Sequence, residues 1–275
     1  MGLHLTLMLP DRTYYLLSPA ISFAALFAIP FGQNSRFVVD ILSFEWYHSV
    51  TTLNGENEMS KKETKLIIVR HGQSVGNLTR RFLGRTDLDL TETGVKQARL
   101  TGEFLKNEQI DAAYSSPLRR ALDTCREIVA FHPGLEIETE PRIAEIYAGK
   151  WENMPFTEVE EKYGHDFRIW KEDIGNAVCT GGESLKDVYK RVSEALEDIV
   201  RKNEGKTVLL TSHGAAIRSM TTFISGLPVE RMKELDWASN ASVTVAYHGE
   251  NGFRLETLGY DEHIGDLRST LPKSV

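Results

Sequence analysis

Two short apolar segments of the chain end in the same way, and this repetition constrains the fold more than any other feature. The segment LIIV, residues 66–69, runs into an arginine, His71 and a glycine, and VLLT, residues 208–211, runs into a serine, His213 and a glycine. Short apolar runs rich in β-branched residues are typical of strands that are buried on both faces. The sequence therefore predicts two buried strands that each stop at a histidine followed by a glycine.

Predicted strands and helices alternate along residues 59–275. The helix at residues 184–202 is the clearest, because Ser184 and Asp187 resemble a capping box and the apolar residues recur at helical spacing. The other predicted helices lie at residues 93–107, 118–131, 156–170, 215–224 and 229–235. Predicted strands lie at residues 65–69, 112–115, 135–139 and 207–211, and residues 242–247 and 253–258 are expected to form a hairpin.

This alternation indicates an α/β fold of three layers, α/β/α, with a mainly parallel central sheet flanked by helices and one antiparallel edge hairpin. Ligands of such sheets bind beyond the carboxyl ends of the strands. We therefore expect His71 and His213 to meet at one edge of the sheet, where the helix that follows the strand at 112–115 also begins. His248 is followed by a glycine as well, but it lies in the hairpin and is expected to be structural.

The residues expected at this edge suit phosphoryl chemistry. Arginine offers planar, bidentate donors for phosphate oxygens, and Arg70 and the pair Arg119 and Arg120 lie at strand ends. A helix that begins just past Gly214 adds oriented N–H groups. Neutral imidazole is a nucleophile toward phosphorus, and nearby arginines disfavour its protonation. Glycine after each histidine lets a substrate approach the backbone closely.

The first 58 residues differ in composition from the rest. They contain two of the 32 basic residues, both arginines, and residues 16–31 are nearly uncharged. A spanning helix needs about 20 apolar residues and a secretory signal needs a basic start, so neither pattern is well matched. We expect residues 1–58 to be a poorly ordered extension outside the fold, and a translation start at Met59 would fit a domain of residues 59–275. A membrane-associated or signal-like segment and a structural extension are the alternatives.

Composition limits the partners of the chain. The formal net charge of −7 argues against nucleic acid or an anionic membrane as a main partner. The two cysteines, Cys125 and Cys179, form no metal-ligand spacing and indicate a reducing compartment. We therefore expect a cytoplasmic protein that binds no metal and no other cofactor. The oligomeric state is left open.

Six segments occur in an order that resembles one known family. They are LIIVRHGQSVGN, LTETG, SSPLRRALDT, EIYAGKWE, GGESLKDVYKR and LLTSHGAAIR. Together they resemble the histidine phosphatase superfamily, in its phosphoglycerate mutase-like branch, over residues 65–260. The first 58 residues lie outside the resemblance.

The resemblance implies roles for individual side chains. His71 resembles the nucleophile that becomes phosphohistidine, and Glu145 resembles the general acid that protonates the leaving oxygen. The phosphoryl group and substrate would be bound by Arg70, Asn77, Arg120, His213 and Gly214.

Several choices stay open in the sequence. Arg120 is preferred to Arg119 only because the arginine of the family immediately precedes the alanine, and Glu152 competes with Glu145 as the carboxylate. The glycines before Ser184, together with Glu183, are expected only to begin the long helix, although their loop borders the site in relatives. Substrate-selecting residues are expected within 80–90 and 150–180. In the first range Arg80, Arg81 and Arg85 indicate either a second acidic group on the substrate or a solvated basic loop.

The preferred function is a phosphomonoester hydrolase that acts through phosphohistidine on a small phosphorylated metabolite. A cofactor-dependent phosphoglycerate mutase is the first alternative, but the mutases of the family carry a longer insertion between the acid and the G-E-S segment. A catalytically idle, membrane-tethered binding module is the second, and a complete set of five site residues argues against it.

Overall fold

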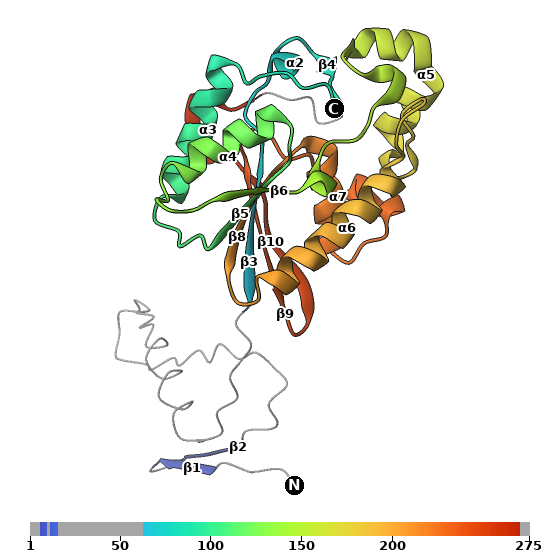
Figure 1. Ribbon diagram of the computed structural model, residues 1–275. Coiled ribbons are helices and arrows are strands. Elements are labelled where there is room, and N and C mark those ends of the chain that lie inside the picture. The colour runs from blue at the N-terminus through green and yellow to red at the C-terminus, as the bar shows by residue number, and fades with distance from the viewer. Residues whose placement is uncertain (1–5, 10–11, 16–62, 270–275) are drawn as a thin grey trace, which may run out of the picture. The chain divides into compact units, whose positions relative to one another are not determined.

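The computed structural model of the protein describes residues 6–9, 12–15 and 63–269 (Figure 1). The chain divides into two compact units, Met1–Glu58 and Met59–Val275. In the first unit the described residues form the antiparallel hairpin of β1 (Thr6–Leu9) and β2 (Arg12–Tyr15). The apolar stretch at 16–31, and with it the expectation of a poorly ordered extension, lies outside the described residues. Among the described residues, no helix is long and apolar enough to span a membrane.

The second unit is built on a six-stranded sheet whose strand order is β10-β9-β3-β8-β5-β6. The four strands from β3 to β6 in this order are parallel, and β9 and β10 form an antiparallel hairpin at the edge. The predicted α/β fold with a mainly parallel sheet and an antiparallel edge hairpin is therefore confirmed. The strands are β3 (Thr64–Arg70), β5 (Ala112–Ser115), β6 (Ile137–Thr139), β8 (Thr207–Ser212), β9 (Val243–Gly249) and β10 (Gly252–Tyr260).

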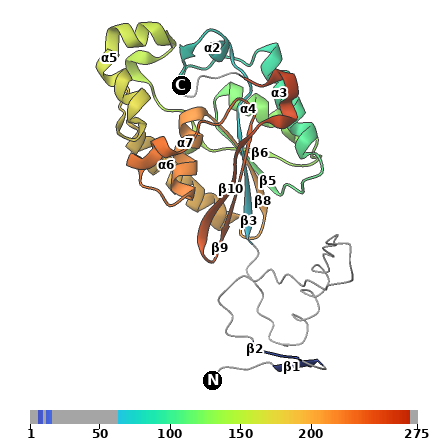
Figure 2. The ribbon, with the colours of Figure 1, turned by 180° about the vertical axis from the view of Figure 1, so that it is seen from behind.

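Helices cover both faces of this sheet (Figures 1 and 2). Leu66 and Ile68 of β3 pack in one apolar cluster with residues of α6 and α7, and the alternate residues Ile67 and Val69 pack in a second cluster with residues of α3 and α4. Burial on both faces explains why the strand is uninterruptedly apolar. The helices are α2 (Val75–Leu78), α3 (Glu92–Leu105), α4 (Arg119–Val129), α5 (Phe156–Glu172), α6 (Leu185–Lys202) and α7 (Gly214–Ile224).

The predicted helices from α3 to α7 are present, with ends shifted by a few residues. The capping box of α6 is also confirmed, because Ser184 Oγ accepts from the Asp187 N–H at 3.1 Å and Asp187 accepts from the Ser184 N–H at 3.0 Å. The predicted helix at 229–235 is instead the 3₁₀ helix η4 (Val229–Glu234), as short segments often are.

Several short elements show no periodic pattern in the sequence and were not predicted. They are α2, the two-residue strands β4 (Arg81–Phe82) and β7 (Met154–Pro155), and the 3₁₀ helices η1 (Pro141–Ile143), η2 (Gly149–Trp151), η3 (Ile174–Asn176) and η5 (Glu262–Leu267). β4 and β7 pair with each other across a long stretch of sequence. Two residues are too few to show an alternating pattern, so only the folded chain reveals this pairing.

The parallel register of β3 and β8 brings the two histidine segments together. Arg70 pairs with Ser212, and the His71 N–H donates to the Ser212 carbonyl at 2.9 Å. His248 pairs with Thr64 at the opposite end of β3. The predicted meeting of His71 and His213 at one sheet edge is thus confirmed, and His248 lies away from it as expected.

The turn that carries His71 packs tightly against the start of α3. A Cβ atom added at Gly94 would lie 2.0 Å from the Gln73 carbonyl oxygen, so no side chain fits there. At Gly164 in α5, an added Cβ would meet nothing within 4 Å.

We predict that Gly94→Ala lowers the free energy of unfolding by about 1–3 kcal/mol, the usual cost of overpacking. Gly164→Ala is the matched control and should leave stability unchanged or raise it by up to about 1 kcal/mol through helix propensity. Denaturant unfolding of both variants measures this. Equal stabilities would show that the turn yields to the added methyl group.

Candidate active site

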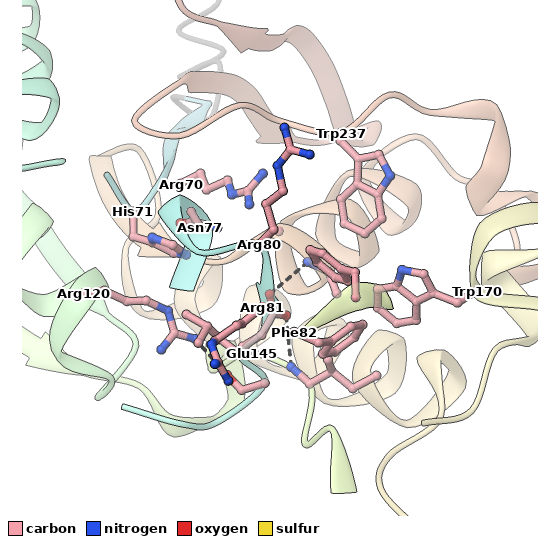
Figure 3. A pocket seen from close by; sticks show the side chains of 16 residues that line it. Arg70, His71, Asn77, Arg80, Arg81, Phe82, Arg120, Glu145, Trp170 and Trp237 are labelled. Carbon is pink, nitrogen blue, oxygen red and sulfur yellow. Dashed lines mark hydrogen bonds between the residues drawn. The ribbon is translucent and has the colours of Figure 1, made fainter. Parts of the chain in front are cut away.

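A pocket of about 160 Å³ opens beyond the carboxyl ends of β3 and β8 (Figure 3). This volume has room for on the order of ten water molecules, which suits a small-molecule ligand. One side of the pocket is polar and the other is aromatic. The polar side includes Arg70, His71, Asn77, Arg120 and Glu145, and the aromatic side includes Phe82, Phe156, Trp170 and Trp237.

His71 presents one unprotonated nitrogen to this pocket. Its Nδ1 lies 2.7 Å from the carbonyl oxygen of Gly72. Because a carbonyl oxygen only accepts, the neutral ring carries its proton on Nδ1 and leaves the lone pair of Nε2 available. Burial of the ring, and then the charges of Arg120 and Arg70, hold the pKa of His71 well below its usual range. The sequence anticipated the effect of the arginines, but burial is the larger cause.

Arg70 and Arg120 are buried guanidinium groups, only 7% and 1% exposed. Neither has a carboxylate oxygen within 4 Å among the described residues, and both donate to backbone carbonyls instead. Arg70 donates to Ala238 at 2.6 Å, and Arg120 donates to Thr86 and Gly84 at 2.9 and 2.8 Å. Burial lowers the pKa of Arg70 to about 10. Two buried cations without a paired carboxylate form a binding site for an anion.

The structure distinguishes the arginine and carboxylate pairs that the sequence left open. Arg119 is exposed and forms ion pairs with Asp87 and Asp89, whereas Arg120 lines the pocket. Glu152 does not line the pocket, and it accepts from the backbone N–H groups of Ala148, Arg85 and Thr86 in a neighbouring loop. This leaves Glu145 as the carboxylate that lines the pocket.

Glu145 is held at the start of α7. Its Oε2 accepts from the Ala215 N–H at 3.3 Å, and its Oε1 accepts from the Ile146 N–H at 3.0 Å (Figure 3). Oε1 also accepts from the Ala216 N–H at 3.2 Å. The N–H groups that the sequence assigned to a bound anion are thus directed at this carboxylate. The helix N-terminus fixes the carboxylate beside the two guanidinium groups.

Asn77 and Gly214 also line the pocket, as predicted. Asn77 Oδ1 accepts from Ser74 and Asn240, which leaves its Nδ2 as the available donor. A Cβ atom added at Gly214 would lie 3.4 Å from both the Arg70 guanidinium carbon and the Trp237 ring. This is an ordinary van der Waals distance, so the packing around this position does not require a glycine.

His213 lies behind His71 rather than on the pocket wall. It is fully buried, its ring centroid is 5.1 Å from that of His71, and its Nε2 lies 2.7 Å from Ser116 Oγ. Burial, followed by the charge of Arg120, holds the pKa of His213 well below its usual range. Its Nδ1 has no hydrogen-bond partner among the residues that the structure describes.

The sequence did not predict that aromatic side chains line one side of the pocket. Phe82, Phe156 and Trp170 fall in the ranges expected to select substrate, but Trp237 precedes β9 and carried no signal in the sequence. The guanidinium of Arg218 lies 4.6 Å from the centre of the Trp237 ring, so a cation–π contact holds this side chain in place.

The basic loop divides between the pocket and the surface. Arg80 and Arg81 line the pocket, whereas Arg85 pairs with Glu183 at 3.2 Å. No group of three or more histidine, cysteine, aspartate or glutamate side chains in the described part of the chain could hold a metal ion.

Comparison with known proteins identifies the family. The family model of the histidine phosphatase superfamily (branch 1) matches residues 66–261. The chain therefore belongs to the histidine phosphatase superfamily and is a phosphatase of the histidine type.

Two relatives illustrate the range of names within this family. Phosphoserine phosphatase 1 of Hydrogenobacter thermophilus is 37% identical over 211 residues, which cover 77% of this chain and 99% of that protein. A probable phosphoglycerate mutase GpmB of Yersinia pestis is 30% identical over 211 residues, which cover 73% of this chain and 94% of that protein.

Solved structures agree with this family. YhfR of Bacillus stearothermophilus has a TM-score of 0.70 and 28% identity and covers 73% of this chain and 99% of its own. A mycobacterial glucosyl-3-phosphoglycerate phosphatase has a TM-score of 0.66 and 28% identity and covers 72% of this chain and 99% of its own.

We predict that Arg120→Lys weakens binding of inorganic phosphate by about 10–100-fold, because a lysine cannot reproduce the charged hydrogen bonds of the planar guanidinium. Arg119→Lys, one residue away and exposed, should bind phosphate within about threefold of the unaltered protein. Titration calorimetry measures both affinities. Equal losses in the two variants would contradict the assignment of the anion site to Arg120.

We predict that the free energy of unfolding decreases as the pH falls below about 6.5, the ordinary histidine pKa. In this pH range His71 and His213 become protonated in the unfolded chain but stay neutral in the folded protein. Acidification therefore favours unfolding. Denaturant unfolding between about pH 7.5 and pH 5 should show a smaller decrease for His71→Gln, whereas exposed His165→Gln serves as the control. An unchanged slope in His71→Gln would refute the depressed pKa.

Proposed function

We propose that the protein hydrolyses a small phosphomonoester through a phosphohistidine formed on His71. The observation that carries this proposal is the juxtaposition of a neutral imidazole nitrogen with two buried guanidinium groups that lack a paired carboxylate. The arginines supply the binding site for the phosphoryl oxygens, and the imidazole supplies the nucleophile.

In the first step, Nε2 of His71 attacks phosphorus and the bond from phosphorus to the ester oxygen breaks. Arg70, Arg120 and the Nδ2 group of Asn77 donate hydrogen bonds to the phosphoryl oxygens. His213 packs against the ring of His71 and does not itself reach the pocket, and Glu145 gives a proton to the departing alkoxide. Electrostatic stabilisation is the main contribution, and loss of one such contact commonly costs about 10²–10³ in rate.

In the second step, water attacks the phosphohistidine on the face that the alcohol has left. Glu145, now ionised, accepts a proton from this water while the bond between phosphorus and Nε2 breaks. Inorganic phosphate and neutral His71 are the products. This cycle returns Glu145 to its protonated state and uses no metal ion.

The substrate is a small phosphorylated metabolite whose alcohol portion lies against the aromatic wall. The names of the relatives support phosphoserine and phosphoglycerate-type esters as candidates. Arg80 and Arg81 lie where an acidic group of such an alcohol would extend. The mutase alternative has a named relative in its favour, but the short segment between Glu145 and Glu183 favours access of water and therefore hydrolysis.

The proposal also covers the domain boundaries, the location and the partners of the protein. Residues 59–275 form the catalytic domain and residues 1–58 are an extension outside it, which is supported by the span of the family match. The free, buried cysteines Cys125 and Cys179 support a cytoplasmic location. The net charge of −7 gives no basis for a nucleic-acid partner.

We predict that His71→Ala releases no phosphate from phosphoserine, 3-phosphoglycerate or glycerol phosphate, because no other neutral imidazole lines the pocket. The exposed His165→Ala should retain the original turnover. A colorimetric phosphate assay measures this, and conversion of 3- to 2-phosphoglycerate is followed in parallel. Appreciable phosphate release by His71→Ala would rule out the proposed nucleophile, and faster isomerisation than release would favour the mutase.

A further inference from the structure

Glu145 lies in an irregular stretch of backbone between η1 and η2. The main chain of Arg70 is fixed by the strand hydrogen bonds of β3, whereas the main chain of Glu145 belongs to no helix or strand. The position of this main chain therefore depends on the side chains that form hydrogen bonds with the carbonyl and N–H groups of residues 142–147.

Arg191 of α6 uses three of its five N–H donors to bind this backbone. Its Nη1 donates to the carbonyl oxygens of Arg142 and Ala144, both at 2.7 Å, and its Nη2 donates to the carbonyl oxygen of Glu145 at 3.1 Å. The two remaining N–H groups, on Nε and Nη2, donate to the carboxylate of Glu183 at 2.9 and 3.1 Å. A guanidinium has five N–H donors, so the set is complete.

Glu183 fixes the other end of the same stretch. Its Oε2 accepts from the Tyr147 N–H at 2.7 Å, and its own N–H donates to the Tyr147 carbonyl at 2.8 Å. Arg85 adds bonds to the Glu183 carboxylate and, at 3.4 Å, to the Glu145 carbonyl. Burial acts to raise the pKa of Glu183, but the bonds from Arg191 and Tyr147 outweigh it and hold the pKa below the usual range.

We propose that Arg191 and Glu183 are positioning residues that hold the backbone of Glu145 so that its carboxylate meets the leaving oxygen of the substrate. This inference rests on the proposed function of Glu145 as the general acid. The expectation that Glu183 only begins α6 was thus too narrow.

This role separates proton transfer from binding of the phosphoryl group. Neither Arg191 nor Glu183 lines the pocket, and neither contacts Arg70, His71 or Arg120 through a hydrogen bond. Loosening them moves Glu145 while the phosphate-binding arginines stay in place. Displacements on the order of 1 Å are enough to impair catalysis.

The test compares two esters that both place a ring against the aromatic wall but differ in their need for an acid. Alkoxide departure from 2-phenylethyl phosphate requires a proton, whereas the phenolate of 2,4-dinitrophenyl phosphate leaves without one. The quantity measured is kcat/KM, which covers the steps up to release of the alcohol. The variants are Arg191→Lys, which keeps the charge but loses the planar fork, and Glu183→Gln, which keeps the shape but loses the charge.

We expect Arg191→Lys to lower kcat/KM for 2-phenylethyl phosphate by about 10–100-fold and for the dinitrophenyl ester by no more than about threefold. This difference between the losses of kcat/KM for the two esters is called the split. Glu183→Gln should show a smaller split than Arg191→Lys. Glu145→Gln, which removes the proposed acid itself, should show the largest split. Lys186 also lies on α6 and forms an exposed ion pair with Glu230 of η4. Lys186→Met is therefore the matched control and should leave both values unchanged.

Losses that are equal for the two esters, or absent for both, in Arg191→Lys and Glu183→Gln would overturn the inference. If Glu145→Gln shows the split and the two positioning variants do not, only this inference fails. If Glu145→Gln itself shows no split, Glu145 is not the acid, so the proposed mechanism fails and the inference with it.

Discussion

The parallel pairing of β3 with β8 is the constraint on which the site depends. Register within this pair aligns Arg70 with Ser212 and places the two histidines side by side just beyond the last paired residues. A shift by one residue would turn Leu66 and Ile68 to the opposite apolar cluster and carry His71 away from the pocket. The apolar core that stabilises the domain therefore also fixes His71, the proposed nucleophile.

The site that results holds charge that the fold does not neutralise with ion pairs. Arg70 and Arg120 are buried and bonded to carbonyl oxygens, which orient the guanidinium groups without cancelling their charge. A bound phosphoryl group supplies the negative charge that the site lacks. The same two cations, together with burial, keep His71 neutral, so the groups proposed to bind the phosphoryl group also favour the state in which His71 would act as nucleophile.

Glu145, the proposed acid, is positioned by other contacts than His71, the proposed nucleophile. Strand hydrogen bonds fix His71, whereas side chains from α6 and the preceding loop bind the backbone around Glu145, and α7 binds its carboxylate. Three separate segments thus hold the backbone and the side chain of one residue. Under the proposed mechanism, Arg191 would affect proton transfer through this backbone without touching the substrate.

The sequence by itself determined the α/β architecture, the long capped helix and the meeting of His71 with His213, because these follow from local periodicity and from the rule that parallel strands end at one edge. Motif resemblance added Asn77, Arg120 and Glu145 as candidates. Only the tertiary structure decided between Arg120 and Arg119, since both occupy the same turn and differ only in which one is buried. It also decided against Glu152, revealed the wall that includes Trp237, and linked Arg191 to Glu145. These are contacts between segments far apart in the chain, and no local pattern of residue types encodes them.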